Sequence, residues 1–295
     1  MVDIRCPVCI NILGRCQENS IFFSGAMTMD TRPVQLVNDF VSEFCGGRWE
    51  LLKTFDFKTL ISSGKFGCPG RNFDCDDTNI IRAIYVLLWQ DLFPDLNMDN
   101  FGYLRQYRGD TMNTFHTMFG RELSNRPGFF AGLEKYSPSD ELRQKVRDFS
   151  KSYTSLGNYL VLPNCFARST TLNCYRGTNA WRDFFDRFLI ELHKVLTSGS
   201  GQDETLSELV KANRFCFDNF TGQENFSNLI EALYLSDYCD GSGLPKLIFS
   251  LNYHWKNEAD REQYFRDAEL YLEKTAAIIR RRADRMAARL KMLCS

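Results

Sequence analysis

The stretch "FDCDDTNIIRAIYVLLWQDLFPD", residues 73 to 95, predicts a helix that is buried on almost every side. Asp76 or Asp77 can cap its start by accepting hydrogen bonds from backbone N–H groups, and Pro94 ends it. Large apolar side chains fill the helix between them: Ile80, Ile81, Ile84, Leu87 and Leu88. Such a helix needs a substantial core around it, and a composition of 44% hydrophobic residues, including 25 Phe, can supply one.

Most of the remaining chain also has helical periodicity. In residues 31 to 47, Pro33 suits a first helical turn and Gly46 can end the helix. Further helices are expected in residues 137 to 153, near 204 to 219 and near 224 to 238, and a long final helix is expected over residues 254 to 293. The fold class predicted is therefore mainly α (α+β), a multi-helix bundle-like core with a small β-hairpin.

Three segments favour strands instead. The run "GNYLVLP", residues 157 to 163, and the run "TTLNCYRG", residues 170 to 177, flank a short turn and predict the hairpin. Residues 48 to 60 also look strand-like. For domains we expect an N-terminal extension over residues 1 to 60, with a helix and a cysteine-containing start, and a helical main domain over residues 61 to 295. This main domain has one compact core or two lobes that meet near residues 157 to 180.

Bulk properties narrow the class of protein. The longest apolar run, "IIRAIYVLLW", is short and contains Arg82, so no membrane association is expected, and no export signal precedes it. The eleven cysteines are then expected to be reduced thiols in a cytoplasmic protein. A net charge of -1 argues against a generally basic nucleic-acid coat. No Walker A, GxGxxG, HExxH or GxSxG pattern is found, and no cofactor is expected.

Residues 181 to 196, "WRDFFDRFLIELHKVL", predict an amphipathic helix that carries Arg187 and His193 six positions apart. An arginine followed at this distance by a histidine resembles the short signature of HEPN-type ribonucleases, whose active site is built with a paired second copy. His193 would then act as general acid/base and Arg187 would stabilise the phosphorane charge, in a homodimer that cleaves RNA without a metal. Helix geometry favours a solvated face instead, because six residues separate the two groups by about 120° around the axis and about 9 Å along it.

Two clusters have metal-ligand chemistry, although no metal is assigned. Cys6 and Cys9 in "CPVC" have the spacing of half a zinc site, with Cys16 nearby, but a second cysteine pair with this spacing is missing. Free thiols near the terminus are the alternative. Asp74, Asp76 and Asp77 could hold Mg²⁺ through clustered carboxylates, and helix capping explains the same residues.

The last helix ends in the basic run "RRRADRMAARLK", residues 280 to 291. This run could contact phosphates of RNA or of a nucleotide. Alternatively, it is a solvated helix end whose cations face the negative pole of the helix dipole.

Several blocks together resemble an uncharacterised family of bacterial proteins, a domain-of-unknown-function grouping. The blocks include "FGYLRQYRGD", "LGNYLVLPN", "DFFDRFLIELHKVL" and "EALYLSDYCD", and the resemblance covers roughly residues 55 to 282. It implies a bacterial cytoplasmic protein but no reaction. A site shared by the family would be expected where polar groups and aromatic rings converge on a pocket. The candidate ligand-binding residues are Asp74, Trp89, Tyr103, Arg105 and Asn164. Core and turn roles are the alternative for Trp89, Tyr103 and Asn164.

Two functions follow as expectations. The first is a non-enzymatic binding or interaction protein with aromatic pockets and a basic C-terminal helix. The second is a defence-type effector or phage-defence toxin with HEPN-like endoribonuclease activity. The absence of a strong catalytic signature favours the binding protein.

Overall fold

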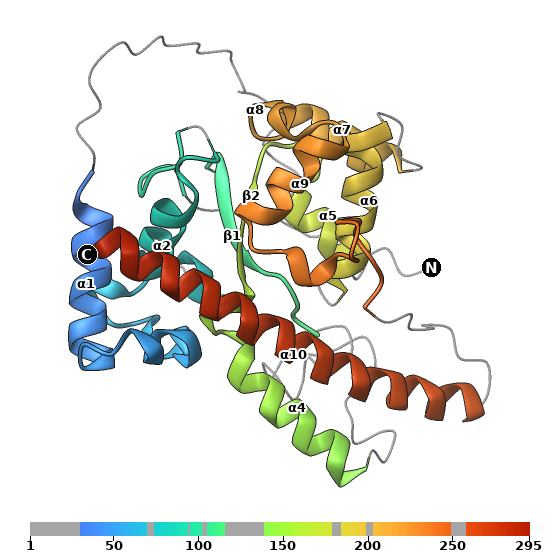
Figure 1. Ribbon diagram of the computed structural model, residues 1–295, viewed down its shortest axis with the longest axis horizontal. Helices are drawn as coiled ribbons and strands as arrows, with labels where there is room; N and C mark the ends of the chain where they lie inside the picture. Colours follow the sequence, from blue (N-terminus) through green and yellow to red (C-terminus); the bar gives the residue numbers. More distant parts are fainter. Residues whose placement is uncertain are drawn as a thin grey trace.

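The structure is a computed structural model that describes residues 30–69, 74–93, 95–101, 105–115, 139–178, 184–198, 203–248 and 258–295 (Figure 1). Its helices are α1 (Arg32–Cys45), α2 (Asn79–Trp89), α4 (Asp140–Tyr153), α5 (Leu172–Thr178), α6 (Phe185–Ser198), α7 (Glu204–Ala212), α8 (Arg214–Phe217), α9 (Gln223–Ala232) and α10 (Glu258–Cys294). The strands are β1 (Tyr107–Thr111) and β2 (Tyr159–Pro163). The fold is mainly helical with a small antiparallel sheet, which confirms the predicted fold class.

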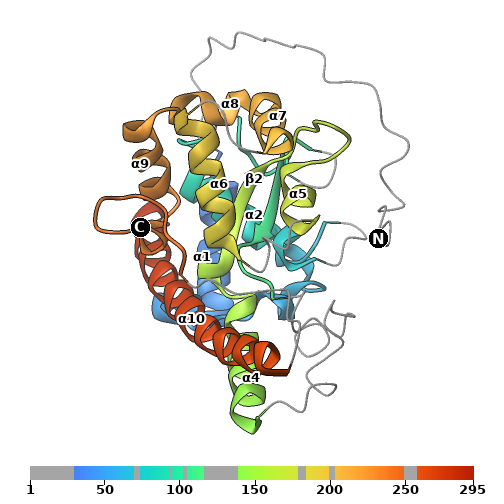
Figure 2. The same cartoon turned by 90° about the vertical axis from the view of Figure 1, so that its right-hand side faces the viewer.

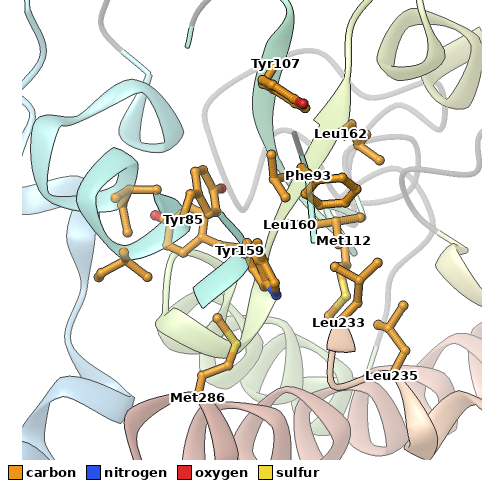
Figure 3. Packing of buried hydrophobic residues seen from close by; sticks show 14 of the residues in the cluster. Tyr85, Phe93, Tyr107, Met112, Tyr159, Leu160, Leu162, Leu233, Leu235 and Met286 are labelled. Carbon is orange, nitrogen blue, oxygen red and sulfur yellow. The ribbon is translucent and has the colours of Figure 1, made fainter. Parts of the chain in front are cut away.

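Strands β1 and β2 form the centre of the molecule. They pair in antiparallel register from Tyr107 opposite Pro163 to Thr111 opposite Tyr159. Every residue of β2 is buried, as expected for a short apolar strand covered on both faces. Aromatic rings join α2 to this sheet: Tyr85 lies edge-on to Tyr159 with ring centroids 6.4 Å apart, and both rings lie among the buried side chains of Figure 3.

Helix α10 runs along one side of the core (Figures 1 and 2). It packs against α4, α1, α2 and two 3₁₀ turns, Trp49–Thr54 and Leu156–Asn158. Tyr271, Leu272 and Ile279, which the sequence places on its apolar stripe, are all buried. At the end of α10, Asn38 on α1 donates a hydrogen bond from Nδ2 to the carbonyl of Cys294 at 3.1 Å. Helices α7 and α8 lie at the end of the molecule opposite to α4 (Figure 2).

Helix α1 belongs to the same apolar cluster as the rest of the core. Its buried residues Val37, Phe40 and Val41 are continuous with the side chains of α2 and β2. Phe40 also packs edge-on against Phe55 with ring centroids 4.9 Å apart. The predicted domain boundary at residue 60 stays a prediction, as does the pair of lobes near residues 157 to 180.

Two strand predictions were wrong. The partner of β2 is β1, nearly fifty residues earlier in the chain, and not the segment from 170 to 177. That segment contains α5, because the Thr171 hydroxyl accepts a hydrogen bond from the backbone N–H of Cys174 at 3.3 Å and so favours a helix start. Residues 48 to 60 form 3₁₀ turns, and the Asp56 carboxylate accepts a hydrogen bond from the N–H of Lys58 that stabilises one of them.

The start of α2 also differs from expectation. Asp76 and Asp77 lie in a separate 3₁₀ turn, Cys75–Asp77, and Thr78 occupies the N-cap position without a side-chain hydrogen bond to the helix. The interior is as predicted, since Ile80, Ile81 and Ile84 are fully buried. Trp89 is the last helical residue, and Pro94 lies outside the described residues.

Gly157 sets how closely α10 approaches the sheet. A Cβ atom at this position would lie 1.9 Å from the Ile279 carbonyl oxygen and 2.8 Å from the Ala283 nitrogen, both in the α10 backbone. Gly157→Ala is therefore expected to lower the free energy of unfolding by about 2–3 kcal/mol, because a rigid helix backbone has to move. Gly241→Ala is the matched control, since nothing lies within 4 Å of its Cβ position. Equal urea midpoints for the two variants would contradict the close approach.

Candidate functional site

An open pocket of about 470 Å³ lies between α1, α2 and the segment that leads into β1. Its volume is within the range typical of small-molecule sites. Three arginines line it, together with one acid and several apolar side chains: Arg32, Arg82, Arg105, Asp99, Asn79, Leu36, Pro69, Met98 and Phe101. The three guanidinium groups come from α1, α2 and the segment before β1, so the fold brings together cations that are far apart in sequence.

The three arginines differ in how far they are already neutralised. Arg32 contacts two carboxylates, Asp30 at 2.8 Å and Asp99 at 3.2 Å. Arg82 is largely buried and its Nη2 lies 3.4 Å from Asp77. Arg105 is exposed and forms no ion pair with a described residue. Arg105 is therefore the one pocket arginine whose charge is not balanced by a carboxylate of a described residue.

Arg82 also leaves a hydrogen-bond donor unused. Its Nε–H is buried and has no acceptor in the structure. A buried donor without a partner costs about 1–3 kcal/mol, so it is normally satisfied by protein, water or ligand. An anion in the pocket could accept from this group.

The predicted ligand-binding residues do not all meet at this pocket. Arg105 lines it, and Asn164 lies directly behind, where its Nδ2 donates to the Arg105 carbonyl at 3.1 Å. Trp89 is fully buried and donates from Nε1 to the carbonyl of Ala232 at 3.0 Å, so it serves the core. Asp74 lies exposed beside the 3₁₀ turn before α2. Tyr103 lies outside the described residues.

The pocket arginines on the two helices were missed by the sequence reasoning. Arg82 interrupts an otherwise apolar helix, and this interruption was a usable signal for a buried functional cation. Nothing in the local pattern around Arg32 distinguishes it from an ordinary surface residue at a helix start.

The acidic turn before α2 places metal-ligand atoms close together. One ligand atom each from Asp74, Cys75 and Asp76 lie within 4.8 Å of one another. Asp77, the third carboxylate of the predicted magnesium site, contacts Arg82 instead. Burial raises the pKa of Asp76 well above its usual value, and the nearby charges of Asp74 and Asp110 add to this effect. Cys6, Cys9 and Cys16, the predicted zinc ligands, lie outside the described residues.

Arg187 and His193 both lie on α6, and each has contacts of its own. His193 Nε2 is 2.7 Å from Gln223 Oε1, and its ring lies edge-on to Phe226 with centroids 4.7 Å apart. Both contacts connect His193 to α9. The guanidinium carbon of Arg187 is 5.6 Å from the centre of the Phe184 ring, near the start of α6.

The basic end of α10 is partly used inside the protein. Arg282 is fully buried, and Arg281 and Arg285 contact the carboxylate of Asp237 at 2.6 and 2.7 Å. Arg280, Arg289 and Lys291 are exposed. The phosphate-binding surface that the sequence suggests is therefore reduced to these three cations.

A family model matches residues 133–286, about half of the chain, and its description is family of unknown function (DUF6994). The chain belongs to this family. The match confirms the predicted resemblance to a family of unknown function and covers α4 through most of α10. Arg32, Arg82, Arg105 and the acidic turn precede the matched segment. No curated protein and no solved structure matches the chain, and none of the described helices is long and apolar enough to cross a membrane.

The ribonuclease hypothesis stays a prediction that one pair of variants can test. If Arg187 and His193 are catalytic, His193→Ala should abolish cleavage of single-stranded RNA by the purified protein. If His193 instead only joins α6 to α9, His193→Ala should lower the melting temperature at least as much as Gln223→Ala, because both remove the same hydrogen bond and His193→Ala also removes the ring contact with Phe226. Equal RNA cleavage by wild type and His193→Ala would contradict the catalytic assignment.

Proposed function

We propose that this protein is a binding protein whose arginine-lined pocket takes an anionic small molecule of the phosphate-ester class, such as a nucleotide. The observation that carries the proposal is that two pocket arginines have unused binding capacity toward the described residues: Arg105 forms no ion pair with them, and the buried Nε–H of Arg82 has no acceptor among them. A guanidinium presents its donors in a planar fork that matches the oxygens of phosphate.

The remaining pocket residues support a ligand with more than a phosphate. Asp99 can accept hydrogen bonds from hydroxyl or amino groups, and Arg32 holds it at the rim. Met98 and Leu36 offer apolar surface for the rest of the molecule. The pocket thus combines cationic groups with a hydrogen-bond acceptor and apolar side chains. Such a combination is typical of sites that orient a small ligand.

We also propose that the protein acts in the bacterial cytoplasm. Support comes from the family resemblance and from the cysteines, because Cys45, Cys75, Cys216 and Cys239 are buried free thiols, which a reducing compartment preserves. The exposed cations at the end of α10 are the second candidate contact surface, for RNA or another polyanion.

Isothermal titration calorimetry with pyrophosphate and adenosine monophosphate tests the pocket. Arg105→Ala should weaken binding by roughly tenfold or more, because a hydrogen bond to a charged group contributes about 1.5–3 kcal/mol. Arg105→Lys should fall between wild type and Arg105→Ala, since it keeps the charge but loses the planar fork.

Arg147→Ala is the matched control, because Arg147 is also exposed but lies on α4 and does not line the pocket. Equal affinities for Arg105→Ala and Arg147→Ala would contradict the pocket as the binding site. If wild type binds neither pyrophosphate nor adenosine monophosphate, the proposed ligand class is wrong.

A further inference from the structure

The acidic turn before α2 has the dimensions of a site for a single ion. Asp74, Cys75 and Asp76 each offer one ligand atom, and these atoms lie within 4.8 Å of one another. Ligands in a tetrahedron around one metal ion at about 2.0–2.3 Å lie about 3.3–3.8 Å apart, and the Cys75 sulfur is already 3.9 Å from Asp74 Oδ1 and 3.7 Å from Asp76 Oδ1. Small side-chain adjustments are therefore sufficient for all three to reach one ion.

Within the described residues, no cationic side chain balances the carboxylate of Asp76. It is only 7% exposed, and no lysine, arginine or histidine in the described part of the chain pairs with it. The arginines on either side contact other acids: Arg82 contacts Asp77, and Arg176 contacts Asp110 at 3.1 Å. Because burial of an unpaired carboxylate is strongly unfavourable, Asp76 needs either a proton or a bound cation.

A second, independent observation points to a missing partner at this place. The Tyr85 hydroxyl is fully buried and has no hydrogen-bond partner among the residues that the structure describes. It lies against Gly109 of β1, where a Cβ would be 2.9 Å from Tyr85 Oη and 3.0 Å from the Asp76 carbonyl oxygen. The hydroxyl therefore faces the narrow space between β1 and the acidic turn. A buried polar group without a partner is a recognised sign of an absent water or ion.

We propose that Asp74, Cys75 and Asp76 bind one divalent transition-metal ion of the Zn²⁺ class, with Tyr85 hydrogen-bonded to a water on that ion. Zn²⁺ accepts thiolate and carboxylate ligands together, usually four in a tetrahedron, whereas Mg²⁺ and Ca²⁺ take oxygen ligands. Three protein ligands leave the fourth position for the water. Binding converts the Cys75 thiol to a thiolate and releases its proton to solvent.

This site is separate from the arginine pocket, and it does not depend on the proposed function. None of the three proposed ligands lines the pocket, whereas Arg82 lines it and pairs with Asp77, the next residue after the ligands. Binding of the metal and binding of the phosphate ester can therefore be tested separately.

The first experiment titrates Co²⁺ and then Zn²⁺ into the full chain in a Cys6→Ser, Cys9→Ser, Cys16→Ser background, which removes the N-terminal thiols. One Co²⁺ per chain is expected, with a thiolate-to-metal absorption band that Zn²⁺ abolishes by displacement. Cys75→Ser should remove the band, and Asp76→Asn should weaken the affinity. Cys239→Ser, which changes another buried thiol, should leave both unchanged. Failure of the background protein to bind either ion, or a band that survives Cys75→Ser, would overturn the proposal.

Tyr85→Phe provides a variant that preserves the packing of the ring. Loss of a group that orients a metal ligand or its water typically costs about 10-fold to 100-fold in metal affinity, so a decrease of at least about tenfold is expected. The melting temperature of the metal-free variant should be equal to or higher than that of wild type, because the hydroxyl has no partner to lose. Unchanged Zn²⁺ affinity in a folded Tyr85→Phe protein would overturn the placement of Tyr85 at the ion.

Discussion

The buried guanidinium of Arg282 holds the main elements of this structure together. It donates hydrogen bonds to the carbonyls of Gly157 at 2.8 Å, Tyr159 at 2.6 Å and Leu233 at 3.0 Å, and its carbon lies 5.7 Å from the centre of the Trp89 ring. One side chain of α10 thereby contacts the start of β2, the end of α9 and the end of α2. Burial lowers the pKa of Arg282 to about 10, so it remains charged at neutral pH and needs all three carbonyls.

With its end held by Arg282, α2 packs against the core on one side and lines the pocket on the other. Its inner side packs Tyr85 and Trp89 against the sheet and α10, and these rings stack with centroids 5.5 Å apart. Its outer side presents Arg82 and Asn79 to the arginine-lined pocket. The turn at its start carries Asp76, pressed against β1. A rigid, centrally packed helix therefore positions both candidate sites, and this is the arrangement that ligand recognition favours, because little order has to be created on binding.

The sequence predicts this fold where apolar residues recur at regular spacing, as in α1, α2, α4, α6 and the long α10. Strand β2 was found from "YLVLP", but its partner "YRGDT" has no apolar alternation. Asp110 is buried there because Arg176 pairs with it, and Gly109 is needed because the Tyr85 ring lies against it. Both causes are long-range contacts that local spacing cannot reveal.

The burial of Arg282 could have been predicted from the sequence. It lies three residues after Ile279 and four before Met286, so helical spacing places it on the buried stripe of α10. Arg105, a predicted ligand-binding residue, lines the pocket, whereas Arg32 and Arg82 join it only through the tertiary fold.

The position of α10 late in the sequence affects how the chain folds during translation. Helices α1 and α4 and the turn that contains Gly157 all pack against α10, which spans Glu258–Cys294 and is synthesised after every one of them. Until it emerges, one side of the core has no cover, and exposed apolar surface of this kind promotes aggregation and binds chaperones. This side of the core therefore closes only after α10 has been synthesised, and the nascent chain needs protection from aggregation until then.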